Sequence, residues 1–449
     1  MINFQSGFQR IFVNGAEKIM YKKVYLLLIA FLFVNSFVVS QSESTLFKKL
    51  KSFKEISDIT PVKHDTTFSE AYEMMVTQPL DHNKPNGTKF KQRIFLLHKN
   101  ETFSTVFVTE GYAAGGNYTS ELTRILNSNQ IIVEHRYFGK SIPQKKDWKY
   151  LNIKQAAADH HSIVQLFKKI YSGKWVSTGI SKGGQTTLYF KRFYPNDIDV
   201  AVPYVAPVNL AQEDPRIYMF LNSVGTEECR KKIIQFQRAF LTKREEIVKL
   251  LMSDAEKENI HFAWDYDFVL EYMTLEYSFA FWQWGSTKCE DIPAADATAE
   301  QLYQHMKKSN PLYFFTQKAM DDFGPFYVQA YNEIGYYGYD LSPFKDLLKE
   351  IKDGSNIMLV PKDAKIKYDC SVMQDVNYWL QKYGSNILYI YGGNDTWSAT
   401  SIQLLGLTNA VKMVKKGGSH GTRIKNFDGE EKEIIYSTLE NWLGIRIKR

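Results

Sequence analysis

Residues 174–184 read KWVSTGISKGG, an apolar, strand-like run followed by a glycine-rich turn. The residues that come next favour a helix that ends before Pro195. Gly179, Ser181 and Gly183 satisfy the pattern GxSxG between a strand and a helix. A serine in so tight a turn needs small residues on both sides. The stretch therefore predicts a nucleophile elbow, in which the serine hydroxyl stands at the end of a sheet.

Strands and helices alternate on both sides of this turn. β-branched and aromatic runs predict strands, and apolar residues at helical spacing predict helices. The predicted strands are residues 90–98, 105–109, 130–134, 174–179, 199–204, 386–391 and 410–414, and the predicted helices are 121–127, 155–171, 184–194 and 429–443. Such alternation favours a mostly parallel sheet. We therefore expect the α/β class and an α/β-hydrolase fold.

Between the two sets of strands the pattern changes to long helical stretches such as residues 228–252. This predicts an inserted, mostly helical cap domain. We expect a signal peptide in residues 1–40 and the cap insertion in residues 215–383. The hydrolase domain is expected in two parts, residues 41–214 and residues 384–449.

A serine hydroxyl becomes a good nucleophile when a histidine takes its proton and a carboxylate orients that histidine. Asp395 directly follows the predicted strand 386–391, and His420 lies in a glycine-rich loop after strand 410–414. In an α/β-hydrolase the acid and then the histidine follow the serine in the chain. Ser181, Asp395 and His420 are therefore the predicted catalytic residues.

The reaction also needs two donors for the oxyanion. The backbone N–H after the nucleophile, that of Lys182, is the expected first donor. Residues 109–116 read TEGYAAGG and follow the strand 105–109. Because the second donor comes from the loop after such a strand, Gly111 or Tyr112 is the expected contributor.

The charge and the cysteines exclude other functions. The chain has 449 residues and a formal charge of +7, but its lysines are scattered, so we expect no nucleic-acid partner. The three cysteines show no Cys/His spacing typical of a metal site, and the predicted chemistry requires no metal and no cofactor. In an oxidising compartment one pair is expected, and we favour Cys229 with Cys289, which leaves Cys370 free.

The N-terminus predicts export. Lys22 and Lys23 precede an apolar run from Val24 to Val39, and small or apolar residues precede Gln41. This is the pattern of a secretory signal peptide, with a start at Met20 as an alternative. The run is about 16 residues, shorter than the ~20 needed to span a bilayer. We expect a secreted or periplasmic protein with no stable membrane insertion after cleavage.

Several longer strings match a known family. They are QPLDH at residues 78–82, VEHRYFGKS at 133–141, GISKGG at 179–184, YVAP at 204–207 and EYSFAFWQWG at 276–285. The chain resembles the secreted prolyl tri-/tetrapeptidyl aminopeptidase family of serine peptidases. The resemblance implies release of short peptides from free N-termini, with preference for proline before the scissile bond. It also implies that Ser181, Asp395 and His420 occupy the family's triad positions.

Peptide substrates would need two kinds of contact. An aminopeptidase must hold an ammonium group, for which a partly desolvated carboxylate is suited. Proline is flat and apolar, so aromatic walls suit it. The candidates for the carboxylate are Glu110, Glu134 and Glu333. Each of them could instead pair with an arginine such as Arg136. The aromatic candidates, each of which could instead belong to the core, are Trp282, Trp284, Tyr336 and Tyr337.

Alternative functions remain on the same fold. The prolylcarboxypeptidase and dipeptidyl-peptidase family shares the string HRYxG with this chain, and so offers a rival specificity. A secreted esterase would use the same triad without an amine-binding carboxylate. A catalytically inactive binding protein would show a missing triad member, whereas all three are present.

Overall fold

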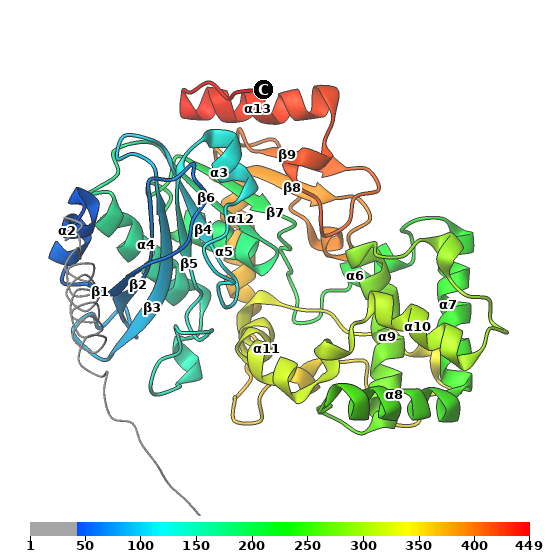
Figure 1. Ribbon diagram of the computed structural model, residues 1–449. Coiled ribbons are helices and arrows are strands. Elements are labelled where there is room, and N and C mark those ends of the chain that lie inside the picture. Colours follow the sequence, from blue (N-terminus) through cyan, green and yellow to red (C-terminus); the bar gives the residue numbers. More distant parts are fainter. Residues whose placement is uncertain (1–42) are drawn as a thin grey trace, which may run out of the picture. The chain divides into compact units, whose positions relative to one another are not determined.

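The computed structural model describes residues 43–449 (Figure 1), of which residues 43–52 belong to one unit and residues 53–449 to a second, compact unit. In the first unit the described part contains helix α2 (Thr45–Ser52). The predicted signal peptide lies outside the described residues. All that follows concerns the second unit. No helix among the described residues is long and apolar enough to cross a bilayer.

Within residues 43–449 the strands form one nine-stranded sheet with the order β1-β2-β3-β5-β4-β6-β7-β8-β9. The pairs from β1 to β5 are antiparallel, and those from β5 to β9 are parallel. The mostly parallel sheet of an α/β-hydrolase is thus confirmed. The strands are β1 (Ile56–Pro61), β2 (Glu70–Pro79), β3 (Lys89–His98), β4 (Thr105–Thr109), β5 (Asn129–Val133), β6 (Trp175–Ile180), β7 (Val200–Tyr204), β8 (Leu388–Gly392) and β9 (Val411–Lys415).

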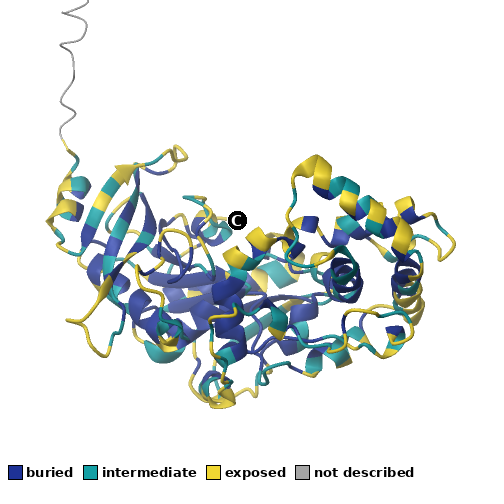
Figure 2. Ribbon diagram, turned by 90° about the horizontal axis from the view of Figure 1, so that it is seen from below, coloured by how far each residue is buried: buried dark blue, intermediate teal, exposed yellow. Residues whose placement is uncertain are grey.

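Helices cover both faces of the sheet. On one face Val106, Val176 and Val200, which are aligned across three strands, join a core with α3 (Glu121–Leu126) and α13 (Gly429–Leu443). On the other face the ring of Phe107 contacts His160 of α4 (Ile153–Phe167) and Phe190 of α5 (Lys182–Phe193). The centre of the sheet is therefore buried on both sides, and it is dark blue in Figure 2.

The segment between β7 and β8 is helical in the described residues. Helix α9 packs against α7, α8 and α10, and a disulfide between Cys229 and Cys289 joins the start of α7 to the turn after α9, as expected. The helices are α6 (Arg216–Leu221), α7 (Glu227–Thr242), α8 (Arg244–Glu258), α9 (Tyr266–Trp284), α10 (Ala299–Ser309), α11 (Gln317–Gln329) and α12 (Cys370–Lys382).

Two details of this segment differ from the sequence prediction. The single helix predicted for residues 228–252 is two helices, because the chain turns at Lys243 and Arg244 at the start of α8 bonds to Asp267 and Glu271 of α9. Helix α12 packs on α5, where Asp375 pairs with Arg192 at 2.9 Å. We therefore propose that the cap ends before α12 and not at residue 383.

Candidate active site

Ser181 occupies the sharp turn between β6 and α5, with φ 57° and ψ −123°. This strained backbone is typical of a nucleophile elbow. A Cβ atom on Gly179 or on Gly183 would lie 2.6 Å from the carbonyl oxygen of Thr109, so neither position can take a side chain without a shift of the backbone. The Ser181 N–H donates to the Tyr204 carbonyl at 2.9 Å. The predicted elbow geometry is therefore present.

Asp395 follows β8, and His420 follows β9. Because β6 to β9 are parallel and adjacent, these residues and Ser181 lie at the same edge of the sheet. Nδ1 of His420 and Oδ2 of Asp395 are 2.7 Å apart, and both side chains are buried. The other carboxylate oxygen accepts the N–H of Trp397 at 3.1 Å. Since Nδ1 is held by the carboxylate, Nε2 remains to accept a proton from a hydroxyl.

The loop after β4 packs on the start of α5. A Cβ atom on Gly111 would lie 2.6 Å from Cβ of Lys182 and 2.7 Å from the nitrogen of Gly183. Among the acceptors of residues 43–449, none takes the N–H of Tyr112 or that of Lys182. The structure thus brings together the two segments from which the sequence predicts the oxyanion donors.

The last turns of helix α9 contact the loops of the acid and the histidine. The Gln283 carbonyl accepts the N–H of His420 at 2.8 Å, and the Phe279 carbonyl accepts the hydroxyl of Thr396 at 2.9 Å. The ring of Trp284 meets that of His420 edge to face at 5.7 Å. Trp284, one of the predicted aromatic residues, therefore lies directly beside the histidine.

A set of stacked, tilted and edge-to-face rings, here called the aromatic cluster, connects the loop after β4 to the loop after β8. Tyr112 contacts Phe326 at 5.6 Å, and Tyr336 contacts Trp397 at 5.8 Å between ring centroids. All rings of the cluster except that of Tyr112 are buried, so they belong to the core as well as being of the type that suits a proline ring. The cluster consists of Tyr112, Phe279, Phe326, Tyr336, Tyr337 and Trp397. It includes Tyr336 and Tyr337, which the sequence analysis singled out.

Glu276 of α9 lies at the side of this cluster. Its carboxylate accepts the hydroxyls of Tyr337 at 2.9 Å and Tyr339 at 2.5 Å. Within residues 43–449 no lysine, arginine or histidine pairs with it. Burial raises its pKa to about 7, although the bonds from Tyr339 and Tyr337 act in the opposite direction. Glu271, one turn earlier, differs because it pairs with Arg244 and accepts several backbone N–H groups.

Glu134 is committed to the protein itself. It is fully buried, pairs with Arg93, and accepts the N–H groups of Ala114 at 3.0 Å and Lys140 at 2.8 Å together with the hydroxyl of Ser141. These donors occupy both oxygens. The expectation that Glu134 binds a substrate amine is therefore not supported, because the antiparallel strand β3 supplies its cation.

Glu110 precedes Gly111 in the loop after β4, and Glu333 lies where its charge acts on Lys182. Glu110 is half-buried beside Gly111 and accepts the hydroxyl of Tyr118 at 2.7 Å; burial raises its pKa to about 7, against the effect of that bond. Glu333 is buried, accepts the N–H of Ile153 at 2.6 Å, and its pKa is likewise raised to about 7 by burial. Glu110 is therefore the more accessible of the two.

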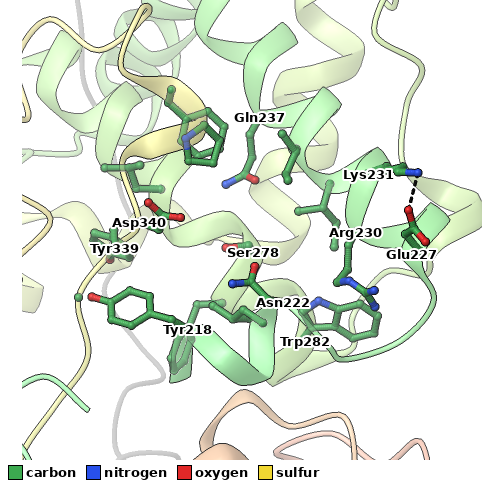
Figure 3. Close-up of a pocket in the computed structure, with 18 residues that line it drawn as sticks. Tyr218, Asn222, Glu227, Arg230, Lys231, Gln237, Ser278, Trp282, Tyr339 and Asp340 are labelled. Carbon is green, nitrogen blue, oxygen red and sulfur yellow. Dashed lines mark ion pairs between the residues drawn. The ribbon is translucent and has the colours of Figure 1, made fainter. Parts of the chain in front are cut away.

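Trp282 belongs to the interior of the cap. Its ring packs against Gly225, and it lines a cavity of about 350 Å³ between α6, α7, α9 and residues 338–344 (Figure 3). Gln237 and Ser278 add polar groups to this cavity, and Phe279 and Tyr339 border it next to Glu276. Of the two predicted tryptophans, Trp284 and not Trp282 contacts His420.

Sequence reasoning missed Glu276, Tyr339 and Trp397. Glu276 stands with Glu271 in a helix rich in aromatic residues, where a carboxylate is unusual; the sequence offers this signal but does not separate the two glutamates. Trp397 follows Asp395 by two residues, and its N–H bonds to that carboxylate, as expected for a turn that begins with aspartate.

Comparison with known proteins gives several matches. A family model described as PS-10 peptidase S37 matches residues 48–448. The prolyl tri/tetrapeptidyl aminopeptidase of Streptomyces mobaraensis is 33% identical over 380 residues, which cover 83% of this chain and 80% of that protein. A probable serine protease of Arabidopsis thaliana is 25% identical over 60% of this chain and 58% of its own. The solved structure of a proline iminopeptidase from Mycobacterium smegmatis aligns with 82% of this chain and 99% of its own, at 11% identity and a TM-score of 0.40.

Proposed function

We propose, from the premise that this chain belongs to the PS-10 peptidase S37 family, that it releases tripeptides or tetrapeptides from free N-termini and prefers proline before the scissile bond. The chain is a serine peptidase by its family. We also propose that it is exported, with residues 1–40 as the signal, so that the N-terminal sequence of the exported protein should begin at Gln41.

Ser181, His420 and Asp395 form the proposed triad. The hydroxyl of Ser181 attacks the carbonyl carbon of the substrate while Nε2 of His420 takes its proton, and Asp395 stabilises the imidazolium through Nδ1. The N–H groups of Lys182 and Tyr112 stabilise the oxyanion. The imidazolium then gives its proton to the leaving amine. Water then attacks the acyl-enzyme while Nε2 of His420 takes its proton. The imidazolium returns a proton to the Ser181 oxygen as the carboxylic acid product leaves.

Glu276 is the proposed ligand of the substrate ammonium, and this carboxylate is the observation that most favours an aminopeptidase. Its described partners are tyrosine hydroxyls, so no cation has to be displaced. Burial raises its pKa, and an approaching ammonium would favour the ionised form. A chain whose N-terminus lies far from the scissile bond could not place its ammonium here. The position of Glu276 in the cap supports release of short peptides.

The aromatic cluster is the proposed site for proline and its neighbours. It joins Tyr112, in the oxyanion loop, to Trp397, beside the triad acid. Phe279 stacks on Tyr337 at 3.8 Å, and the hydroxyl of Tyr337 reaches Glu276. A peptide bound along these rings would have its carbonyl at Ser181 and its ammonium at Glu276.

Glu110 is a second candidate for the ammonium, because it too is half-buried, has a raised pKa and borders the oxyanion loop. Two such carboxylates favour a cationic substrate terminus over the anionic terminus that a carboxypeptidase must bind. Glu110→Gln and Glu276→Gln distinguish them, since only the true ligand should discriminate between free and acetylated N-termini.

The proposed function can be tested with covalent probes. Ala-Ala-Pro diphenyl phosphonate, with a free or an acetylated N-terminus, should modify Ser181, and mass spectrometry of the digested protein locates the adduct. We expect fast labelling of Ser181 by the free probe, slow labelling by the acetylated probe, and none in Ser181→Ala. Equal rates for the two probes would contradict amine recognition, and labelling of another serine would contradict the triad.

A further inference from the structure

The side chain of Lys182 is buried next to the proposed nucleophile, and the mechanism above uses only its backbone. Its Nζ donates to the Gly111 carbonyl at 2.7 Å. The same Nζ lies 5.5 Å and 5.2 Å from the ring centroids of Tyr112 and Phe138. Within residues 43–449 no carboxylate forms an ion pair with it. A buried ammonium without such a partner is costly, so its position beside the elbow requires a physical explanation.

The bond to Gly111 acts on one peptide group. The carbonyl of Gly111 and the N–H of Tyr112 belong to the same planar unit, so holding the oxygen also fixes the direction of the N–H. A charged donor on the oxygen polarises the peptide and makes its N–H a stronger donor. Tyr112 supplies one of the two proposed oxyanion donors. The ammonium is therefore connected to the oxyanion through a single peptide group.

We propose that Lys182 is a positioning residue, whose ammonium holds and polarises the Gly111–Tyr112 peptide so that its N–H stabilises the oxyanion formed at Ser181. This inference rests on the oxyanion hole of the proposed function, but not on the peptide specificity. The aromatic rings of Tyr112 and Phe138 hold the cation in place from two sides.

Of the basic groups Lys182, His135 and His160, Lys182 is the one that gains or loses its proton near pH 7. Burial lowers the pKa of Lys182 to about 7, and Glu333 in the cap offsets part of this. Burial, and then the charge of Lys182, lower the pKa of His135 well below its usual range, and burial lowers that of His160 to about 4. Both imidazoles are therefore neutral at pH 7. Burial raises the pKa of Glu333 to about 7. Deprotonation of Lys182 above pH 7 should weaken the oxyanion hole.

Lys182→Met tests the proposal, because methionine keeps the apolar stem and removes the ammonium. Lys191→Met is the matched control. Lys191 lies on the same helix, is also buried, and donates to the carbonyls of Pro195 and Ile198 at 2.9 Å, away from the oxyanion loop. Each variant is measured with p-nitrophenyl acetate and with Ala-Ala-Pro-p-nitroanilide between pH 6 and 9.

We expect kcat of Lys182→Met to fall by roughly 10- to 100-fold on both substrates, with KM changed by less than about threefold. Its decline of kcat above pH 7 should disappear. The control should keep both kcat and the decline. A wild-type kcat in Lys182→Met, or an equal loss in Lys191→Met, would overturn the proposal. A merely structural role would change KM and stability without removing the alkaline decline.

Two further outcomes separate this inference from the proposed function. If the wild type hydrolyses the ester but no peptide, the proposed specificity is wrong, and the comparison of Lys182→Met with Lys191→Met on the ester still decides the role of Lys182. If Ser181→Ala keeps ester hydrolysis, both proposals are overturned. If Lys182→Met does not fold, Lys182→Gln replaces it as an uncharged donor, and unchanged kcat and pH dependence in that variant would overturn the role of the charge.

Discussion

Glu276→Gln removes the negative charge that we propose binds the substrate ammonium, and it keeps the shape of the side chain. The amide oxygen of glutamine can still accept one tyrosine hydroxyl, and the tyrosine hydroxyls of residues 337 and 339 can rotate to accept from its amide nitrogen. We therefore expect a loss of stability of no more than about 1 kcal/mol. The effect on catalysis should be much larger, because an ammonium would lose its ionised partner.

The size of this effect follows from the environment of Glu276. An ion pair at 4 Å gains about 4 kcal/mol at an effective dielectric constant of 20, and desolvation offsets part of it. Hydrogen bonds to charged groups contribute about 1.5–3 kcal/mol net. With 2–3 kcal/mol lost, kcat/KM for a free tripeptide substrate should fall about 30- to 150-fold. The value for the acetylated substrate should stay within about twofold.

The assay is hydrolysis of Ala-Ala-Pro-p-nitroanilide with a free and with an acetylated N-terminus. Glu271→Gln is the control, because Glu271 is on the same helix but binds Arg244 and backbone N–H groups. We expect it to lower the melting temperature and to leave the ratio of free to acetylated kcat/KM unchanged. If Glu276→Gln lowers kcat/KM equally for the free and the acetylated substrate, or for neither, Glu276 does not bind the amine.

Three other predictions concern the oxyanion loop, pH and the disulfide. Gly111→Ala should lower kcat at least about 100-fold, because its Cβ would lie 2.6 Å from Cβ of Lys182 and displace the loop. Gly115→Ala in the same loop has open space around it and should remain active. Similar kcat values for the two variants would contradict the assignment. Burial raises the pKa of Glu276 to about 7, so KM for the free peptide should fall as pH rises through 7 and the carboxylate ionises. KM should increase again above about 8, where the α-amine of the peptide loses its proton. KM for the acetylated peptide should show neither change. Replacement of Cys229 and Cys289 by serine opens a loop with a sequence separation of 60 and should lower the free energy of unfolding by up to about 4 kcal/mol. The urea midpoint should fall while kcat is retained. An unchanged midpoint would refute the stabilising role of the disulfide.

The sheet, and the position of Ser181, Asp395 and His420 at one edge of it, could be predicted from the sequence because their signals are local. Ser181, Asp395 and His420 each follow an apolar strand directly, so the parallel order of these strands brings the three residues to one edge. Strands β1 and β2 were not predicted. Near the end of β2 a buried position is polar: Gln78 donates to the side-chain oxygen of Gln92 and to the carbonyl of Asp159. A polar residue with such long-range partners cannot be recognised from its neighbours in the chain.

The substrate-binding residues were harder to predict for the same reason. Glu134 is a candidate ligand in the sequence, but its cation, Arg93, comes from a strand about 40 residues earlier. Glu276 depends on Tyr337 and Tyr339, which lie about 60 residues later in the cap. Which carboxylate is neutralised by the fold and which remains for a substrate is decided by tertiary contacts, not by the local pattern.

The most direct test of the proposed function is hydrolysis of Ala-Ala-Pro-p-nitroanilide, free and acetylated, by the wild type and by Ser181→Ala. The account predicts that the wild type releases p-nitroaniline from the free peptide far faster than from the acetylated one, and that Ser181→Ala releases it from neither. Equal hydrolysis of both peptides by the wild type, or activity retained in Ser181→Ala, would contradict it.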